Sequence, residues 1–190
     1  MTELLIGLAL WIGAHLTKRM MPGIRRDMAK ALGERPTRGI IAVVILVSVV
    51  LMVMGYRSMD LISVYTPFSW AGHLNNTLMF FALFAFGIGP AGGRLSAKFR
   101  HPMLWGVFLW AAAHLLVNGD LASILLFGGL GLWSLVQIRL INQTEGPWER
   151  PMPGNALNDY KLLLGVLFLY ALIAGIHWLF GHNPFLGIYS

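Results

Sequence analysis

Six apolar stretches dominate this sequence of 190 residues, and most of them approach the length needed to cross a bilayer. A helix needs about 20 residues to span about 30 Å of hydrocarbon. The stretches cover residues 4–17, 39–56, 70–89, 102–117, 121–141 and 162–180. Helices are expected because an open sheet would leave backbone groups unpaired in lipid. The sequence therefore predicts an all-α fold: a polytopic membrane helical bundle of about six transmembrane helices, forming a single domain over residues 1–190.

The distribution of basic residues predicts the orientation of this bundle. Thirteen of the 14 Lys and Arg residues lie in the segments that follow the first, third and fifth stretches, and Arg57 alone lies on the other side. Loops rich in Lys and Arg remain cytoplasmic. We therefore expect a multi-pass protein of the inner (plasma) membrane with both termini on the outer, periplasmic side. The net charge of +6 is then expected to meet membrane lipid rather than nucleic acid.

The basic segment between the first two stretches has a pattern of its own. Apolar side chains recur there at spacings of three and four residues, with basic residues between them: Met21, Ile24, Met28 and Leu32. This pattern is typical of an amphipathic helix on the membrane surface. The alternative is a basic loop.

Histidines are the main candidates for chemistry, because the chain has six of them and no cysteine. Disulfides, thiolate metal sites, iron–sulfur clusters and cysteine nucleophiles are thereby excluded. Helix depth sorts the histidines into an inner pair and an outer set: His15 and His101 inside, and His73, His114, His177 and His182 outside. An interfacial histidine can simply cap a helix or reach the headgroups, and this reading suits His73, His101 and His182.

His114 is the strongest candidate ligand, because it lies within an apolar run. Trp110 and Asn118 lie four residues to either side of it and therefore share its helix face. A neutral imidazole is a common haem or metal ligand, and a nearby amide or carboxylate can fix its tautomer. The neighbouring glycines Gly128, Gly129 and Gly131 fit either close helix packing or a pocket for a flat cofactor.

The segment Arg100-His101-Pro102, followed by Gly106, suggests another chemistry. It resembles the Arg-His-Pro motif of membrane methyltransferases that modify isoprenylcysteine or phospholipid amines. Those enzymes bind S-adenosylmethionine near the cytoplasmic face, where this segment is expected to lie. Leu104 stands where that family has an aromatic residue.

Several segments together resemble the NnrU family of bacterial membrane proteins. They are Gly13-Ala14-His15, residues 38–56, His73-Leu74, and the long run from His101-Pro102 through His114 and Asn118-Gly119-Asp120 to Gly129. That family is associated with denitrification, specifically with active nitrite and nitric oxide reductases. It is similar to the 15-cis-ζ-carotene isomerase of plants and cyanobacteria, a membrane enzyme that contains haem b.

The resemblance implies haem b as cofactor, with His15 and His114 at the positions of the isomerase's proposed axial ligands. It also implies reductase components as partners, or a lipophilic substrate. Straight helices with a rise of about 1.5 Å per residue would leave these two histidines roughly 15 Å apart in depth. The depth-matched pairs are His15 with His101, or His114 with His73 or His177, and these stay open.

Four functions follow as hypotheses. The first is a haem-b-binding protein that supports nitrite or nitric oxide reductase activity. The second is an isomerase acting on a polyene, with Trp105, Trp110 and Trp133 lining its cleft. The third is a methyltransferase-like protein, and the fourth is a non-enzymatic assembly factor that holds a reductase subunit.

Overall fold

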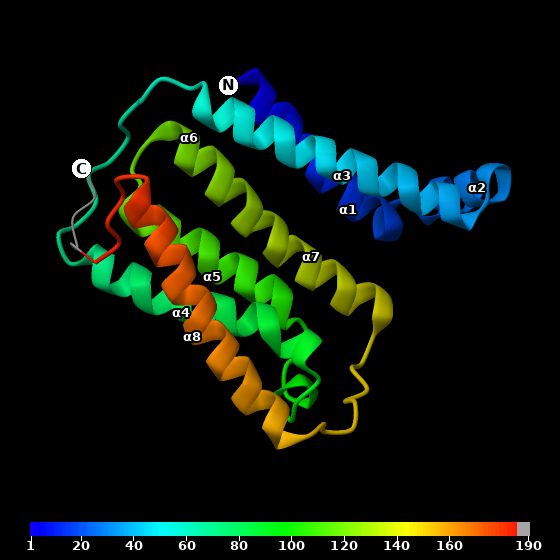
Figure 1. Ribbon diagram of the computed structural model, residues 1–190. Helices are drawn as coiled ribbons and strands as arrows, with labels where there is room; N and C mark the ends of the chain where they lie inside the picture. Colours follow the sequence, from blue (N-terminus) through cyan, green and yellow to red (C-terminus); the bar gives the residue numbers. More distant parts are fainter. Residues whose placement is uncertain (186–190) are drawn as a thin grey trace. The chain divides into compact units, whose positions relative to one another are not determined.

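The computed structural model describes residues 1–185 of the chain, and within this range the secondary structure is helical. The chain divides into two compact units, Met1–Ile62 and Ser63–Ser190. The first unit contains α1 (Thr2–Met20), α2 (Pro22–Leu32) and α3 (Glu34–Arg57). The second contains α4 (Ala71–Ala91), the short turn η1 (Leu95–Ala97), α5 (Pro102–Val117), α6 (Leu121–Ser123), the π-helical turn η2 (Ile124–Gly128), α7 (Gly129–Glu145) and α8 (Ala156–Leu179) (Figure 1). That the two units form one domain stays a prediction.

The first unit is a hairpin of α1 and α3, which lie side by side (Figure 1). Two glycines allow the two backbones to approach closely. A Cβ on Gly7 would lie 2.8 Å from the Ser48 carbonyl oxygen, and a Cβ on Gly55 would lie 2.8 Å from Leu4 Cα. Small residues at a helix interface are typical of packing in membranes, where van der Waals contact replaces the hydrophobic effect.

The short helix α2 joins α1 to α3 within this hairpin. Pro22 begins it, at a position where a missing N–H costs nothing, and Gly33 ends it with φ at 91°, a region that favours glycine. The helix expected for this basic segment is therefore confirmed, and the alternative of an irregular loop is wrong.

In the second unit, α5 packs between α4 and α7, and α8 packs mainly on α4. Small residues again set the closest contacts. A Cβ on Gly106 of α5 would meet the Phe86 ring and the Ala82 carbonyl of α4. A Cβ on Gly131 of α7 would lie 3.1 Å from Ala111 Cβ on α5. Gly131 therefore serves close packing of α7 on α5, as one of the two readings of these glycines expected. Gly128 does not, because a Cβ there would meet nothing within 4 Å.

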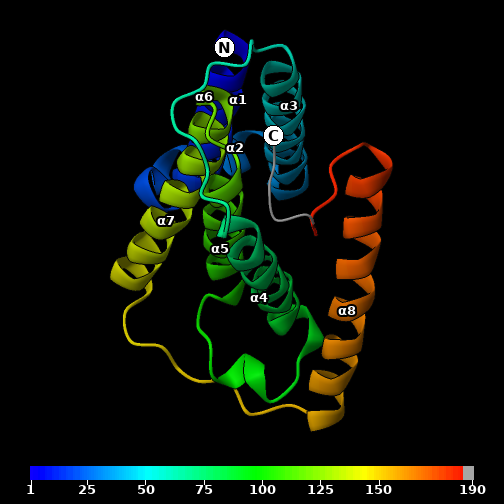
Figure 2. The ribbon, with the colours of Figure 1, turned by 90° about the vertical axis from the view of Figure 1, so that its left-hand side faces the viewer.

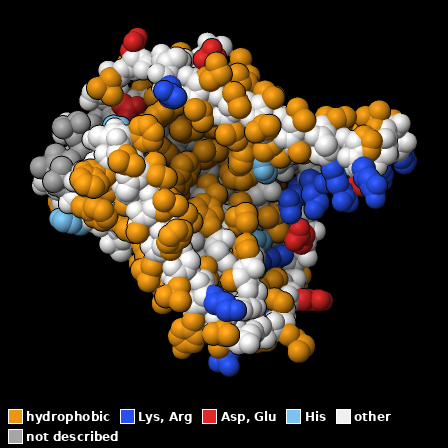
Figure 3. All heavy atoms as spheres, viewed as in Figure 1, with side chains coloured by type: hydrophobic (Ala, Val, Ile, Leu, Met, Phe, Trp, Pro, Cys, Tyr) orange, Lys and Arg blue, Asp and Glu red, His pale blue; other side chains and the backbone are white. Residues whose placement is uncertain are grey.

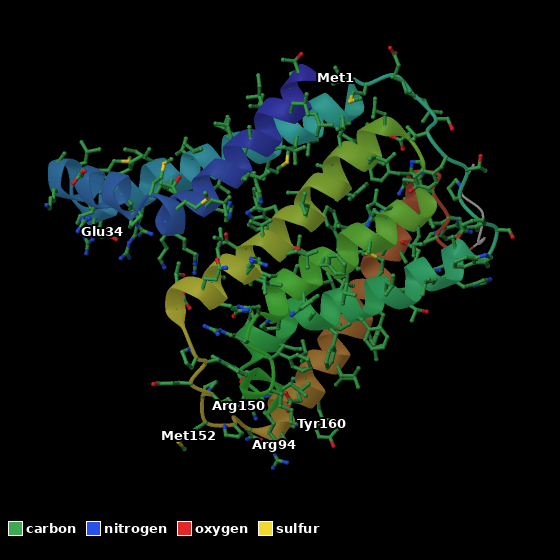
Figure 4. All side chains as sticks on the ribbon, turned by 180° about the vertical axis from the view of Figure 1, so that it is seen from behind. Met1, Glu34, Arg94, Arg150, Met152 and Tyr160 are labelled. Carbon is green, nitrogen blue, oxygen red and sulfur yellow. The ribbon has the colours of Figure 1, made fainter. Side chains whose placement is uncertain are left out.

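Connections in the second unit alternate between its two ends. The segment after α4 and the segment after α7 meet at one end, where Arg94, Arg150, Met152 and Tyr160 lie near one another (Figure 4). Backbone hydrogen bonds from Val64 and Tyr65 to Gly119 join the segments at the other end. The basic segments after α4 and after α7 thus lie together, and the Gly154 N–H donates to the Gly93 carbonyl oxygen between them.

The helix α8 is the least covered element of the second unit (Figure 2). Only 6% of its most apolar 18-residue window is buried, and large apolar side chains such as Leu164, Phe168 and Leu172 are exposed. A helix that is apolar on all sides is typical of a membrane span.

Within residues 1–185, four helices are long and apolar enough to cross a membrane: α3, α4, the continuous helix Leu121–Glu145 that joins α6 to α7, and α8. The expected membrane protein with lipid-facing helices is thus confirmed. The helix α5 has the 16 residues that the sequence predicted, which is shorter than the other spans. The helix α1 has 19 residues but carries Lys18 and Arg19 in its last turn, and it is not among the four.

Candidate functional site

The imidazole of His114 lies in the last turns of α5 and is half-buried. Its Nδ1 lies 2.9 Å from the carbonyl oxygen of Trp110, one turn earlier in the helix. Since a carbonyl only accepts, Nδ1 carries the proton in this contact and Nε2 keeps the lone pair of the neutral ring. The helix backbone thus fixes the tautomer in which Nε2 carries the lone pair that a metal would bind.

Aromatic side chains surround this imidazole. The Phe127 ring stacks on it with centroids 4.5 Å apart and planes 24° apart. The Trp110 ring lies 5.1 Å from the imidazole and meets Phe127 edge-on at 5.0 Å. Phe127 is buried and belongs to the π-helical turn η2, a structure that frequently occurs at functional sites. The result is an apolar, aromatic environment around one histidine.

Asn118 supports α5 rather than the imidazole itself. Its side-chain amide donates to the His114 carbonyl oxygen at 2.8 Å, so it closes the helix end. The expected tautomer-fixing role of an amide is therefore taken by the Trp110 carbonyl instead. Asp120 serves the next helix, since it accepts hydrogen bonds from the Ser123 N–H at 2.9 Å and the Ser123 hydroxyl at 2.6 Å.

The segment before α4 crosses this end of the second unit. The Tyr65 hydroxyl donates to the carbonyls of Leu115 and Asn118, and the Val64 N–H donates to Gly119 at 2.8 Å. Burial raises the pKa of the Tyr65 hydroxyl, and the Asp120 carboxylate raises it further. The hydroxyl therefore stays protonated and holds the end of the His114 helix. Sequence reasoning missed Tyr65, because nothing local marks a contact 50 residues away.

His177 repeats the hydrogen-bond pattern of His114. Its Nδ1 lies 2.8 Å from the Ile173 carbonyl oxygen, near the end of α8, and its side chain is exposed. It lies within electrostatic range of His114. Of the outer histidines that the sequence singled out, these two are the ones that the structure brings into one neighbourhood.

His15 is the candidate histidine of the first unit. Its Nδ1 lies 2.8 Å from the Trp11 carbonyl oxygen, and its ring lies 4.3 Å from the Trp11 ring. The pattern Leu-Trp-x-x-Ala-His-Leu occurs twice, at residues 10–16 and 109–115, and gives the same tryptophan–histidine pair each time. Trp11 was missed, although this repeat is the signal that finds it. The structure describes His15 within its own unit and does not join it to His114.

His101 and Arg100 hold the start of α5 to the end of α7. The His101 Nε2 lies 2.9 Å from the Asn142 side-chain oxygen, and the Arg100 guanidinium donates to the Gly146 carbonyl at 2.8 Å. The side chains of Arg100 and His101 are thus both engaged in hydrogen bonds between α5 and the end of α7.

His73, in the first turn of α4, is exposed. Trp133 is buried within the second unit and Trp105 is exposed.

Among the described residues, no group of three or more His, Asp or Glu side chains is arranged to hold a metal ion. A haem makes a different demand, because the porphyrin occupies four positions of the iron and the protein supplies one or two axial ligands. A neutral histidine whose Nδ1 donates to a backbone carbonyl fits that demand. His15, His114 and His177 all have this geometry.

Comparison with known protein families gives one match. The model of a family described as NnrU protein covers residues 3–184, nearly the whole chain. Neither a curated protein nor a solved structure is significantly similar to the chain.

Proposed function

Because the chain belongs to the NnrU family, we propose that it is a six-helix protein of the inner membrane, with both termini periplasmic, that binds haem b through histidines and supports denitrification. The partners of such a protein are components of nitrite or nitric oxide reductase. The observation that carries the haem proposal is the His114 imidazole, whose Nδ1 is engaged by the Trp110 carbonyl while its ring lies among aromatic side chains.

The residues of this chain would do three things for the haem. His114 would supply one axial nitrogen from Nε2. Trp110 and Phe127 would hold the imidazole plane and keep water from it, because both rings pack against it. Tyr65 and Asn118 would keep the end of α5 closed, so that the ligand stays in place. A haem held this way supplies one-electron chemistry or a store of haem for the reductases.

A second histidine that would hold the haem iron is His15 or His177 in this proposal. Both have Nδ1 bound to the carbonyl four residues earlier, which leaves Nε2 as the ligand atom. His15 follows the family resemblance and the repeated sequence pattern. His177 is favoured because it lies near His114 within the second unit.

The decisive measurement is the visible spectrum of the detergent-purified protein, oxidised and reduced, with the haem quantified as its pyridine complex. We expect a Soret band in the wild-type protein and a loss of most haem in His114→Ala. His182→Ala is the matched control and should keep full haem content, because that exposed histidine lies beyond the end of α8. Absence of a Soret band even after reconstitution with haem would refute the cofactor proposal, and full haem in His114→Ala would refute the ligand.

The second ligand is identified by comparing His15→Ala with His177→Ala in the same assay. Loss of one axial ligand of a six-coordinate haem converts the iron from low spin to high spin, which shifts the absorption and electron paramagnetic resonance spectra. The variant that shows this spectral shift while it retains haem identifies the second histidine ligand. For the role in denitrification, deletion of the gene should lower nitrite or nitric oxide reductase activity in membranes, and a plasmid copy should restore it.

A further inference from the structure

A basic groove opens beside α2 in the first unit, and no histidine lines it. It has a volume of about 620 Å³ and is lined by the C-terminal turn of α1, by α2, and by the first residue of α3. This volume lies within the range of about 300–1,000 Å³ that ligand sites occupy. Its charged lining consists of four cations, Lys18, Arg25, Arg26 and Lys30, and one carboxylate, Glu34.

Charge makes this groove suitable for an anion. Its lining carries a net charge of about +3 when Lys and Arg are protonated and Glu34 is ionised. The carboxylate is already shared, since Glu34 lies 3.3 Å from Arg25 and 3.0 Å from Arg38. Glu34 lies at this end of the unit among side chains that end in nitrogen (Figure 4), and Lys and Arg side chains gather on the same face (Figure 3).

Exposed apolar side chains on and beside α2 favour a lipid as the source of the anion. Met20, Ile24 and Leu32 are each at least half exposed, although α2 is a well-formed helix with basic residues beside them. Helices with this pattern lie in the membrane interface, with the apolar side chains among acyl chains and the basic ones among headgroups. The connections of α2 agree, because it joins α1 directly to α3, which is long and apolar enough to span.

We propose that this groove binds the headgroup of an anionic phospholipid, whose phosphate pairs with Arg26, Lys30 and Lys18, while Ile24 and Leu32 on the other face of α2 lie among acyl chains of the membrane. The planar guanidinium of Arg26 can bind two phosphate oxygens at once, and the lysines act as point charges. Arg25 braces the groove wall through Glu34. A bound lipid would hold α2 against the hairpin of α1 and α3.

Native mass spectrometry of the full-length protein in micelles tests this proposal, with dioctanoyl-phosphatidylglycerol and dioctanoyl-phosphatidylcholine as probes. We expect the anionic lipid to bind more tightly. The double variant Arg26→Gln/Lys30→Gln should weaken its binding at least about tenfold, since each cation near a lipid surface contributes on the order of a factor of five. The double variant Arg35→Gln/Arg57→Gln removes the same charge from the first unit outside the groove and should bind as the wild type does.

Three results would overturn the proposal. The first is unchanged binding in Arg26→Gln/Lys30→Gln. The second is equal loss in both double variants, which would indicate a general effect of net charge. The third is displacement of the lipid by millimolar inorganic phosphate, which would indicate a site for a soluble anion. The charge-conserving variant Arg26→Lys/Lys30→Arg should keep binding within a few-fold, and it separates loss of charge from loss of fold.

Discussion

Gly55 limits how closely the two long helices of the first unit can approach. A Cβ at this position would lie 2.8 Å from Leu4 Cα, and backbone atoms cannot move aside as a flexible side chain can. Leu4 is fully buried, so the contact lies at the centre of the hairpin. The distance between α1 and α3 is therefore set by glycine.

We expect Gly55→Ala to destabilise the protein by about 1–3 kcal/mol, because the added methyl group must separate α1 from α3. The measurement is the thermal unfolding midpoint in detergent. Gly39→Ala, on the same helix, is the control: a Cβ there meets nothing within 4 Å, so alanine should stabilise by about 0.4–1 kcal/mol. Equal midpoints for the two variants would contradict the packing described at Gly55.

At the scale of single residues, the sequence identified the centre of the candidate site but not its surroundings. His114, Trp110 and Asn118 were found because residues four apart share a helix face. Phe127 and Tyr65 were not found, since their contacts with α5 depend on how distant segments pair. Asn118 was found, but its role was not, because its side-chain amide donates to the His114 backbone carbonyl and not to the imidazole ring.

Among the elements, the centres of the helices were predictable, whereas the ends of most helices, except α5, were not. The range of α5 was predicted correctly, because Pro102 begins it and Asn118-Gly119 ends it. The helices α1, α3 and α8 continue beyond the apolar runs into polar residues such as Lys18, Arg35 and Asn158. Long basic side chains can reach the headgroups from within a helix, so charge marks the edge of the lipid rather than the end of the helix.

Asp159 shows what the polar start of α8 does. Its carboxylate accepts the backbone N–H of Arg94 at 2.9 Å and that of Leu95 at 3.3 Å, and it packs directly on Gly93. One side chain of α8 thus satisfies two donors that α4 and η1 leave open. Asp159 therefore fastens the last helix to the segment between α4 and α5.

We expect Asp159→Ala to weaken this attachment by about 1–3 kcal/mol, because the exposed Arg94 N–H and the half-buried Leu95 N–H both lose a charged acceptor. Trypsin cleavage after Lys161 should become faster than in the wild type, since the start of α8 would open more often. Glu149→Ala removes an exposed carboxylate from the segment that joins α7 to α8 and should leave the rate unchanged. An unaltered rate in Asp159→Ala would show that the two hydrogen bonds do not hold α8.

For the whole molecule, the absence of cysteine makes the proposed topology directly testable. Leu61 precedes α4 and is 87% exposed, and Met152 lies between α7 and α8 and is 91% exposed. In a bundle of six spans these two positions lie on opposite sides of the membrane. The positive charge near Met152 predicts that this side faces the cytoplasm.

We therefore expect a membrane-impermeant maleimide to label Leu61→Cys in intact spheroplasts and Met152→Cys only after lysis. Lys98→Cys, in the other basic segment of the second unit, should behave like Met152→Cys. The unmodified protein serves as the blank. Labelling of Met152→Cys alone in intact cells would reverse the orientation, and labelling of both positions would exclude the alternation of six spans.

The nearly complete exposure of α8 has a consequence for biogenesis. A helix whose surface is apolar on every side gains enough from lipid to leave the translocon by itself, without a neighbour to shield it. α5 is different, since it carries His114 and ends at Asn118, and its small residues need α4 and α7 beside them. Insertion of α8 and its docking on α4 are thus separable events. The contacts that dock it include Asp159 near its start, which accepts from the Arg94 N–H, and Tyr170 in its middle, whose hydroxyl donates to the Asn76 carbonyl oxygen at 3.3 Å.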